Sequence, residues 1–182
     1  GVLSGTQNLV IAGGVESMSQ VPIGASIIDG FKADHGVPYG KKLSERYPGV
    51  QFNQFAGAEM LARKYELTQD ELNAFALDSH VKAKRAVEEG RFKNEIVPIE
   101  IELEDGSREL HLQDEGIRME ATLGAIAGLQ PLQENGLLTA ANASQICDGA
   151  AAVMIANGAT CKRLGLQPLA RIVAMSVIGS DP

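Results

Sequence analysis

Apolar residues recur at helical spacing in the middle of the chain. Over 55–65 they fall on one face of a short helix. A second helix is predicted from Thr68, which can cap it while Glu71 reaches back, because Thr-x-x-Glu is the capping-box pattern. Its apolar stripe continues at three- and four-residue steps to Val87, and Gly90 can supply a left-handed end. The pattern therefore predicts two consecutive amphipathic helices.

A hairpin is predicted after these helices. Apolar and polar residues alternate over 95–103 and again over 109–112. Asp105-Gly106 between them favours a tight turn, since glycine accepts the positive φ that such turns need. Pro98 has no backbone N–H, so the first strand either lies at an edge or begins after it.

Short apolar runs predict three strands of the kind found inside a sheet, over 8–12, 150–157 and 169–178. The first run ends in Gly13-Gly14, which we interpret as a tight turn, although two glycines also let another backbone or a ligand come close. Over 21–50 no periodicity survives, so little regular structure is expected there.

Two short helices complete the pattern, one after Thr122 that stops near Pro131 and one over 159–164. The fold class expected from this order is α/β, with a sheet interrupted by a subdomain from about Val21 to Leu138.

Composition narrows the function classes. Sixteen Lys and Arg against 23 Asp and Glu give a formal charge of −7, so no basic face is expected to bind nucleic acid. No apolar run reaches membrane-spanning length, so no membrane partner is expected. An anionic ligand could still bind through one arginine and backbone N–H groups. The chain opens on Gly1 rather than Met, and we expect it to be an internal piece of a longer protein.

The residues by themselves assemble no catalytic set. His35, His80 and His111 are each interpreted as surface or structural histidines. Cys147 and Cys161 have no metal-ligand spacing and are interpreted as reduced thiols of a reducing compartment. A nucleophilic role for Cys147 would need a base or a positive partner, whereas its neighbour in sequence is an acid.

Polar residues in a loop of small residues are the other candidates. Asn142, Ser144 and Asp148 are interpreted first as side chains that satisfy backbone groups around turns. Arg118 lies between two apolar residues and could simply be a surface arginine.

Four sequence blocks occur in a specific order: LVIAGGVESMS over 9–19, GRFKNEIVP over 90–98, DEGIR over 114–118 and LTAANASQICDGAAAV over 138–153. Together they resemble the thiolase family, which makes or breaks a carbon–carbon bond between acyl-CoA molecules. The resemblance implies a layered α/β/α fold with an inserted α+β loop subdomain. It divides the chain into the end of the N-terminal half (1–20), the loop subdomain (21–138), a return into the first sheet (139–166) and the start of the C-terminal half (167–182).

The resemblance also implies roles for particular residues. Ser144 matches the hydroxyl that contacts the pantetheine arm, with Ala140 in the same motif, and Arg118 lies where the family holds the adenine nucleotide. Gln54 and Phe55 fall where the acyl pocket is lined; the family often has His-Met or Met-Gly there, which leaves the acyl chain length open.

One further departure is Gln133, where the family commonly has an aromatic residue. The family's catalytic cysteines and histidine belong to motifs that do not occur in this chain, so we expect no catalytic residue here and no activity from these residues alone.

Two readings follow from the resemblance. The first is an acyl-CoA C-acyltransferase that uses coenzyme A thioesters as substrates, needs no permanently bound cofactor or metal, and forms homodimers or homotetramers. Fatty acid β-oxidation in the cytoplasm of a bacterial type of cell, or in a mitochondrial or peroxisomal matrix, is the implied setting. The second is a non-catalytic, thiolase-like protein that binds coenzyme A or acts as a scaffold. A third interpretation is an α/β scaffold without any ligand.

Overall fold

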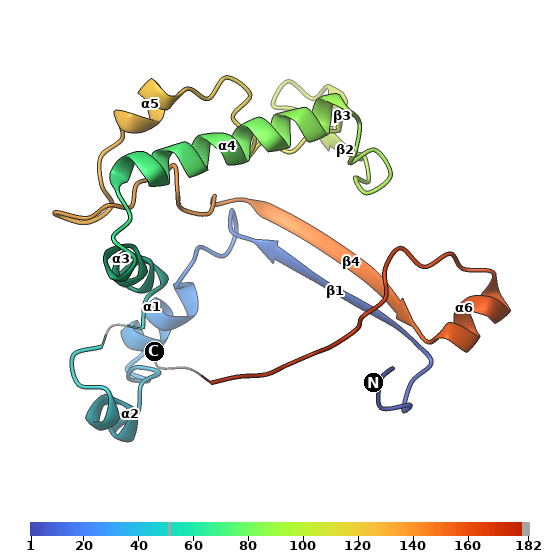
Figure 1. Cartoon of the computed structure of the whole chain (residues 1–182), viewed down its shortest axis with the longest axis horizontal. Helices are drawn as coiled ribbons and strands as arrows, with labels where there is room; N and C mark the ends of the chain where they lie inside the picture. The colour runs from blue at the N-terminus through green and yellow to red at the C-terminus, as the bar shows by residue number, and fades with distance from the viewer. Residues whose placement is uncertain (51, 180–182) are drawn as a thin grey trace. The chain divides into compact units, whose positions relative to one another are not determined.

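The computed structural model describes residues 1–50 and 52–179. The chain forms two compact units, one made of Gly1–Val50 with Ile146–Pro182 and the other of Gln51–Gln145 (Figure 1). The four-part division inferred from the family resemblance stays a prediction.

The first unit is built on a long two-stranded ribbon. β1 (Leu9–Ser17) pairs antiparallel with β4 (Asp148–Ala156), and the two arrows lie side by side in Figure 1. The two predicted strands are therefore confirmed as strands. Their expected place inside a sheet is wrong, because both are mostly exposed in this two-stranded ribbon. The turn predicted at Gly13-Gly14 is wrong, because β1 continues through both glycines to Ser17.

The glycine pair serves a close approach of two backbones instead of a turn. Gly13 lies opposite Ala152, and a Cβ atom on Gly13 would lie 2.9 Å from the carbonyl oxygen of Ala151 and 3.2 Å from the Cβ of Ala152. A Cβ on Gly14 would meet no atom within 4 Å. Of the two, Gly13 is therefore the position where a side chain is excluded.

Two short helices occupy the stretch that was expected to be irregular. They are α1 (Ala25–Lys32) and α2 (Lys41–Arg46). Neither has a side-chain N-cap hydrogen bond or an acidic residue in its first turn. The expectation was wrong here because the usual signals of a helix start are missing from the sequence.

The end of the first unit departs from prediction in one element. α6 (Gly158–Leu164) forms as expected, with Asn157 as its cap and Gly165 left-handed at φ 65°. The strand predicted over 169–178 does not form among the described residues. An apolar run becomes a strand only when a second strand pairs with it, and the described chain offers this run none. The part assigned by resemblance to the start of the C-terminal half (167–182) extends beyond the described residues, which end at 179.

The second unit opens with the two predicted helices, and both are confirmed. α3 (Gln54–Lys64) is capped by Asn53. α4 (Gln69–Glu88) begins with the complete Thr68–Glu71 capping box, and the Thr68 backbone N–H lowers the pKa of the Glu71 carboxyl. Gly90 ends α4 at φ 66°, and the N–H of Arg91 reaches back to the carbonyl of Ala86, as in a Schellman motif.

The predicted hairpin and short helix are confirmed too. β2 (Ile99–Glu102) starts directly after the proline and pairs antiparallel with β3 (Arg108–His111). Gly106 turns the chain at φ 80°. α5 (Leu123–Ala127) is capped by Thr122 and packs against α4 (Figure 1).

The buried apolar residues of the second unit are two alanines and two larger aliphatic residues: Ala62, Ala76, Ile126 and Leu138. Large apolar side chains are mostly exposed in both units, including Val153 and Met154 of β4. Among the described residues, no helix has the length and apolar character needed to cross a membrane.

We expect Gly13→Ala to lower the free energy of unfolding by about 1–3 kcal/mol, because the new Cβ must push against the β4 backbone. Gly14→Ala is the matched control and should be neutral or slightly stabilising, since its Cβ meets open space. Urea unfolding followed by circular dichroism measures both. Equal effects of the two substitutions would contradict a close approach at Gly13.

Candidate functional site

A buried carboxylate holds the backbone that leads into the loop of small residues. Glu59 on α3 is only 5% exposed. Its Oε1 accepts hydrogen bonds from the backbone N–H groups of Leu137 and Leu138, each at 2.8 Å. A Cβ on Gly136 would lie 2.7 Å from the same oxygen. Glycine at 136 therefore leaves room for a charge-assisted link between α3 and the loop.

The loop after this link is closed by its own side chains. The Thr139 N–H donates to Asn142 Oδ1 at 2.7 Å, and the Ala141 N–H donates to Thr139 Oγ1 at 3.2 Å. Thr139 is 1% exposed, whereas Ala140 and Ser144 are exposed. The interpretation that Asn142 satisfies a turn backbone is thus confirmed, and the loop presents Ala140 and Ser144 to solvent.

The Arg118 segment is attached to α4. The backbone N–H of Arg118 donates to His80 Nδ1 at 3.2 Å. One turn further along α4, Lys84 Nζ donates to the Met119 carbonyl at 3.0 Å and lies 3.5 Å from Glu120. The exposed Arg118 side chain therefore projects from a backbone that α4 holds at two successive points.

The segments that carry Arg118 and Ser144 are joined to each other. Gln145 Nε2 donates to the carbonyl of Gly116. Gly116 is also fixed by its own N–H, which donates to Asp114 Oδ1 at 2.7 Å. Ser144 directly precedes Gln145, and Arg118 lies two residues after Gly116. The structure therefore places these two predicted site residues on neighbouring backbone segments.

Gln54 and Phe55 form the first turn of α3. Asn53 Oδ1 accepts from the backbone N–H of Phe55 at 2.8 Å, and this cap fixes the start of the helix. Gln54 is exposed and Phe55 half-buried. Within the described part of the chain, no hydrogen bond connects either residue to Arg118 or Ser144.

A separate polar cluster joins two sequence motifs in the first unit. Asp148, which opens β4, accepts from the Ser19 hydroxyl at 2.5 Å and the Ser19 N–H at 2.8 Å, and from the Ser17 hydroxyl at 3.2 Å. These hydrogen bonds lower the pKa of the Asp148 carboxyl. The Ser19 hydroxyl has the largest effect, and the Ser19 N–H has the next largest. Asp148 therefore ties the start of β4 to the end of β1.

The two cysteines remain free thiols. Cys147 is exposed and Cys161 half-buried, and no disulfide links them. The neighbouring Asp148 is already hydrogen-bonded to two serines and is held as a carboxylate, so it offers Cys147 no positive partner.

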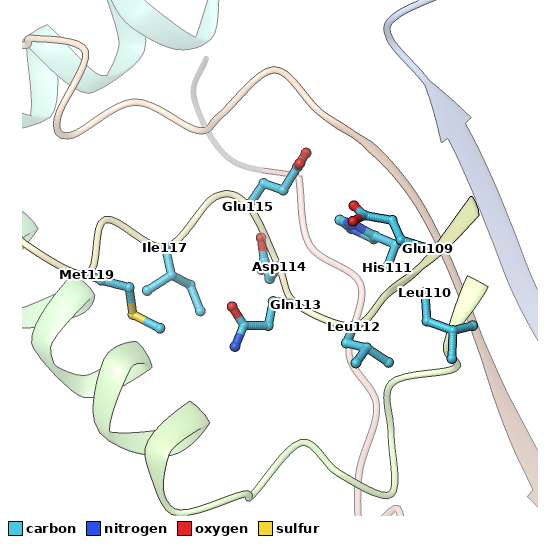
Figure 2. A pocket seen from close by; sticks show the side chains of 9 residues that line it. All are labelled: Glu109, Leu110, His111, Leu112, Gln113, Asp114, Glu115, Ile117 and Met119. Atoms are coloured by element: carbon cyan, nitrogen blue, oxygen red, sulfur yellow. The ribbon is translucent and has the colours of Figure 1, made fainter. Parts of the chain in front are cut away.

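An open hollow of about 430 Å³ lies beside β3 in the second unit (Figure 2). Three carboxylates line it, from Glu109, Asp114 and Glu115, together with His111. Such a lining repels phosphate groups, and none of the predicted site residues contributes to it. No group of three or more His, Cys, Asp or Glu within the described ranges could hold a metal ion.

The comparisons with known proteins agree with the sequence motifs. The family model "Thiolase, N-terminal domain" matches residues 1–159. The chain is 42% identical to a steroid 3-ketoacyl-CoA thiolase of Mycobacterium tuberculosis over 100% of this chain and 44% of that protein. It is 39% identical to an acetyl-CoA acetyltransferase of Rhizobium meliloti over 100% of this chain and 47% of that protein.

Solved structures give the same result. An acetyl-CoA acetyltransferase of Syntrophomonas wolfei matches with a TM-score of 0.66 at 35% identity, over 91% of this chain and 42% of that chain. Human mitochondrial 3-ketoacyl-CoA thiolase matches with a TM-score of 0.67 at 32% identity, over 91% of this chain and 43% of that chain. The chain thus has a thiolase-like α/β fold and belongs to the thiolase family. It spans about half the length of the curated relatives it matches.

Several residues that shape the site were not predicted for it: Glu59, His80, Lys84 and Gln145. Glu59 did carry a signal, because it lies three residues before the buried Ala62 and so shares its face of α3. His80 and Lys84 lie four residues apart on one face of α4, but nothing in the sequence indicates which segment they contact.

We expect Ser19→Ala to raise the pKa of Asp148 towards its ordinary value of 3.8, because the Ser19 hydroxyl, the largest cause of the lowered pKa, is lost while the backbone N–H remains. The pKa of Asp148 is lower in the folded than in the unfolded protein. The hydrogen bonds to its carboxylate therefore contribute fully to stability above the pKa of the unfolded state, and the contribution disappears as the pH falls through the pKa of the folded state. Carboxyl NMR titration measures it. An unchanged pKa in Ser19→Ala, with Ser4→Ala as control, would contradict the assignment.

Glu59→Ala should lower the free energy of unfolding by roughly 2–5 kcal/mol, since two backbone N–H groups lose their acceptor in a buried place. Glu59→Gln should lower it less, because an amide oxygen can still accept from both. The Oε2 atom makes no hydrogen bond within the described residues, so the amide nitrogen replaces no existing contact. Urea unfolding distinguishes the two variants, and identical losses would argue against the acceptor role.

Proposed function

We propose that these residues form the coenzyme A-binding part of an acyl-CoA C-acyltransferase, a thiolase that forms or cleaves the carbon–carbon bond of a 3-ketoacyl-CoA. The observation that carries the proposal is the Gln145–Gly116 hydrogen bond, which joins the segments of Ser144 and Arg118. Family membership and the names of the relatives support the same activity.

Each proposed contact has a chemical reason. Coenzyme A has an anionic nucleotide at one end and an amide-rich pantetheine arm. Arg118 is exposed and offers both a permanent charge and a flat guanidinium for the nucleotide. Ser144 can exchange a hydrogen bond with a pantetheine amide, and Ala140, without polar side-chain atoms, leaves space beside it. The two residues would thus bind opposite parts of one extended ligand.

The acyl group is assigned to the first turn of α3. Phe55 is half-buried and apolar, and Gln54 is exposed and polar. Gln54 and Phe55 differ from the residues common at these positions in the family. This difference supports a preference for acyl groups of a different size or shape in this protein. Gln133 stands where the family commonly has an aromatic residue. This supports nucleotide binding that depends more on Arg118.

The covalent chemistry is assigned to residues outside this chain. A thiolase needs a nucleophilic cysteine and a cysteine–histidine pair that handles protons. Cys147 and Cys161 occupy neither family position, and we propose no catalytic role for either. A non-catalytic, thiolase-like protein that only binds coenzyme A is the alternative, and turnover separates the two.

We further propose that the intact protein is a homodimer or homotetramer that acts in fatty acid β-oxidation in a bacterial-type cytoplasm. The exposed apolar side chains of β4, such as Val153 and Met154, support burial of that ribbon in the assembled protein.

Arg118→Ala should raise the KM for coenzyme A of the full-length protein by about 10-fold or more, because a charge-assisted contact to phosphate is lost. Arg63→Ala, which changes an exposed arginine on α3, is the matched control and should leave KM unchanged. Thiolysis of acetoacetyl-CoA with varied coenzyme A measures both, and calorimetric titration with coenzyme A gives the affinity directly.

Binding of coenzyme A without any thiolysis would favour the non-catalytic alternative. Absence of both binding and turnover would overturn the proposed function. An equal effect of the Arg118 and Arg63 substitutions would remove Arg118 from the site.

A further inference from the structure

Two side chains on one face of α4 contact the backbone from which Arg118 projects. His80 Nδ1 accepts the Arg118 N–H at 3.2 Å, and Lys84 Nζ donates to the Met119 carbonyl at 3.0 Å. Residues four apart lie one above the other on a helix, so the two contacts bind successive residues of the same segment. Both contacts are to main-chain atoms, so they fix the backbone and leave the Arg118 side chain free for a ligand.

The other side-chain restraints on this segment lie on its two sides. Gln145 holds Gly116 before Arg118, and Thr122 caps α5 after it. Between them no regular secondary structure supplies backbone hydrogen bonds to residues 117 and 118. Without His80, the N–H of Arg118 would depend on water. Among the described residues, the segment would then be fixed at its ends, by Lys84 and by the Ala121 N–H, which donates to the Arg118 carbonyl at 3.1 Å.

We infer that His80 and Lys84 are positioning residues that fix Arg118 for the nucleotide end of coenzyme A. The inference rests on the proposed function, in which Arg118 binds that nucleotide. Neither residue touches the reacting atoms; each acts through the backbone at 118–119. Loss of either contact should weaken coenzyme A binding by making Arg118 less preorganised, while the chemical step proceeds as before.

Substitutions of His80 separate positioning from packing. His80→Ala removes the acceptor, whereas His80→Asn places Oδ1 the same number of bonds from the backbone as Nδ1 of histidine. His80→Ala should raise the KM for coenzyme A about three- to tenfold with kcat nearly unchanged, the size expected for one hydrogen bond. His80→Asn should restore most of the wild-type KM.

Lys84 provides an independent test on the same helix. Lys84→Ala should raise the same KM about two- to fivefold, because the Met119 carbonyl loses its donor. Lys82→Ala is the matched control. Lys82 is exposed and, among the described residues, forms an ion pair only with Asp78 of its own helix, so its loss should leave KM unchanged.

The experiment measures thiolysis of acetoacetyl-CoA by the full-length protein with coenzyme A varied, and includes Arg118→Ala and the melting temperature of every variant. The inference is supported if His80→Ala raises the KM for coenzyme A and His80→Asn brings it back towards the wild-type value. An unchanged KM in His80→Ala, with a raised KM in Arg118→Ala, overturns the inference and leaves the proposed function intact. If both His80 variants lower kcat and the melting temperature to the same extent, and His80→Asn does not restore the KM, the inference is also overturned. His80 would then have a purely structural role. A wild-type protein that binds no coenzyme A overturns the proposed function itself.

Discussion

The carboxylate of Glu59 links the helix α3 to the loop that carries Ser144, and the geometry of the second unit depends on this contact. One oxygen accepts two successive backbone N–H groups at 2.8 Å, and Asn142 accepts the next one. A loop of small residues has little apolar surface with which to fix itself, so buried polar bonds must define its course. With three consecutive N–H groups satisfied by side chains, the loop can present Ser144 from a fixed backbone.

The same principle operates at Arg118. A ligand with a charged end and a long flexible arm is bound best by groups already in place, since each freely moving side chain or segment must be ordered on binding. Here α4 supplies two restraints to the segment of Arg118, and Gln145 connects that segment to the one of Ser144. The proposed binding surface is therefore assembled from a helix, a turn and a loop that are far apart in sequence.

The sequence by itself determined the local elements of the second unit and the family. The capping box at Thr68, the glycine end at Gly90 and the Asp105-Gly106 turn were all predicted correctly, because each depends on residues within a few positions of one another. Arg118 and Ser144 were identified as site candidates through ordered family motifs, and the structure places their segments next to each other.

Only the tertiary structure decided the contacts between distant segments. Gly13-Gly14 has the composition of a turn, yet β4 approaches so closely that glycine is needed within a strand instead. The run 169–178 has the composition of a strand, yet no partner pairs with it in the described chain. Glu59, His80 and Lys84 look like ordinary polar residues of helices until the segments 116–120 and 136–142 lie beside them. Pairing, burial and hydrogen bonding across long sequence separations are properties of two segments at once, and so the pattern of one segment cannot specify them.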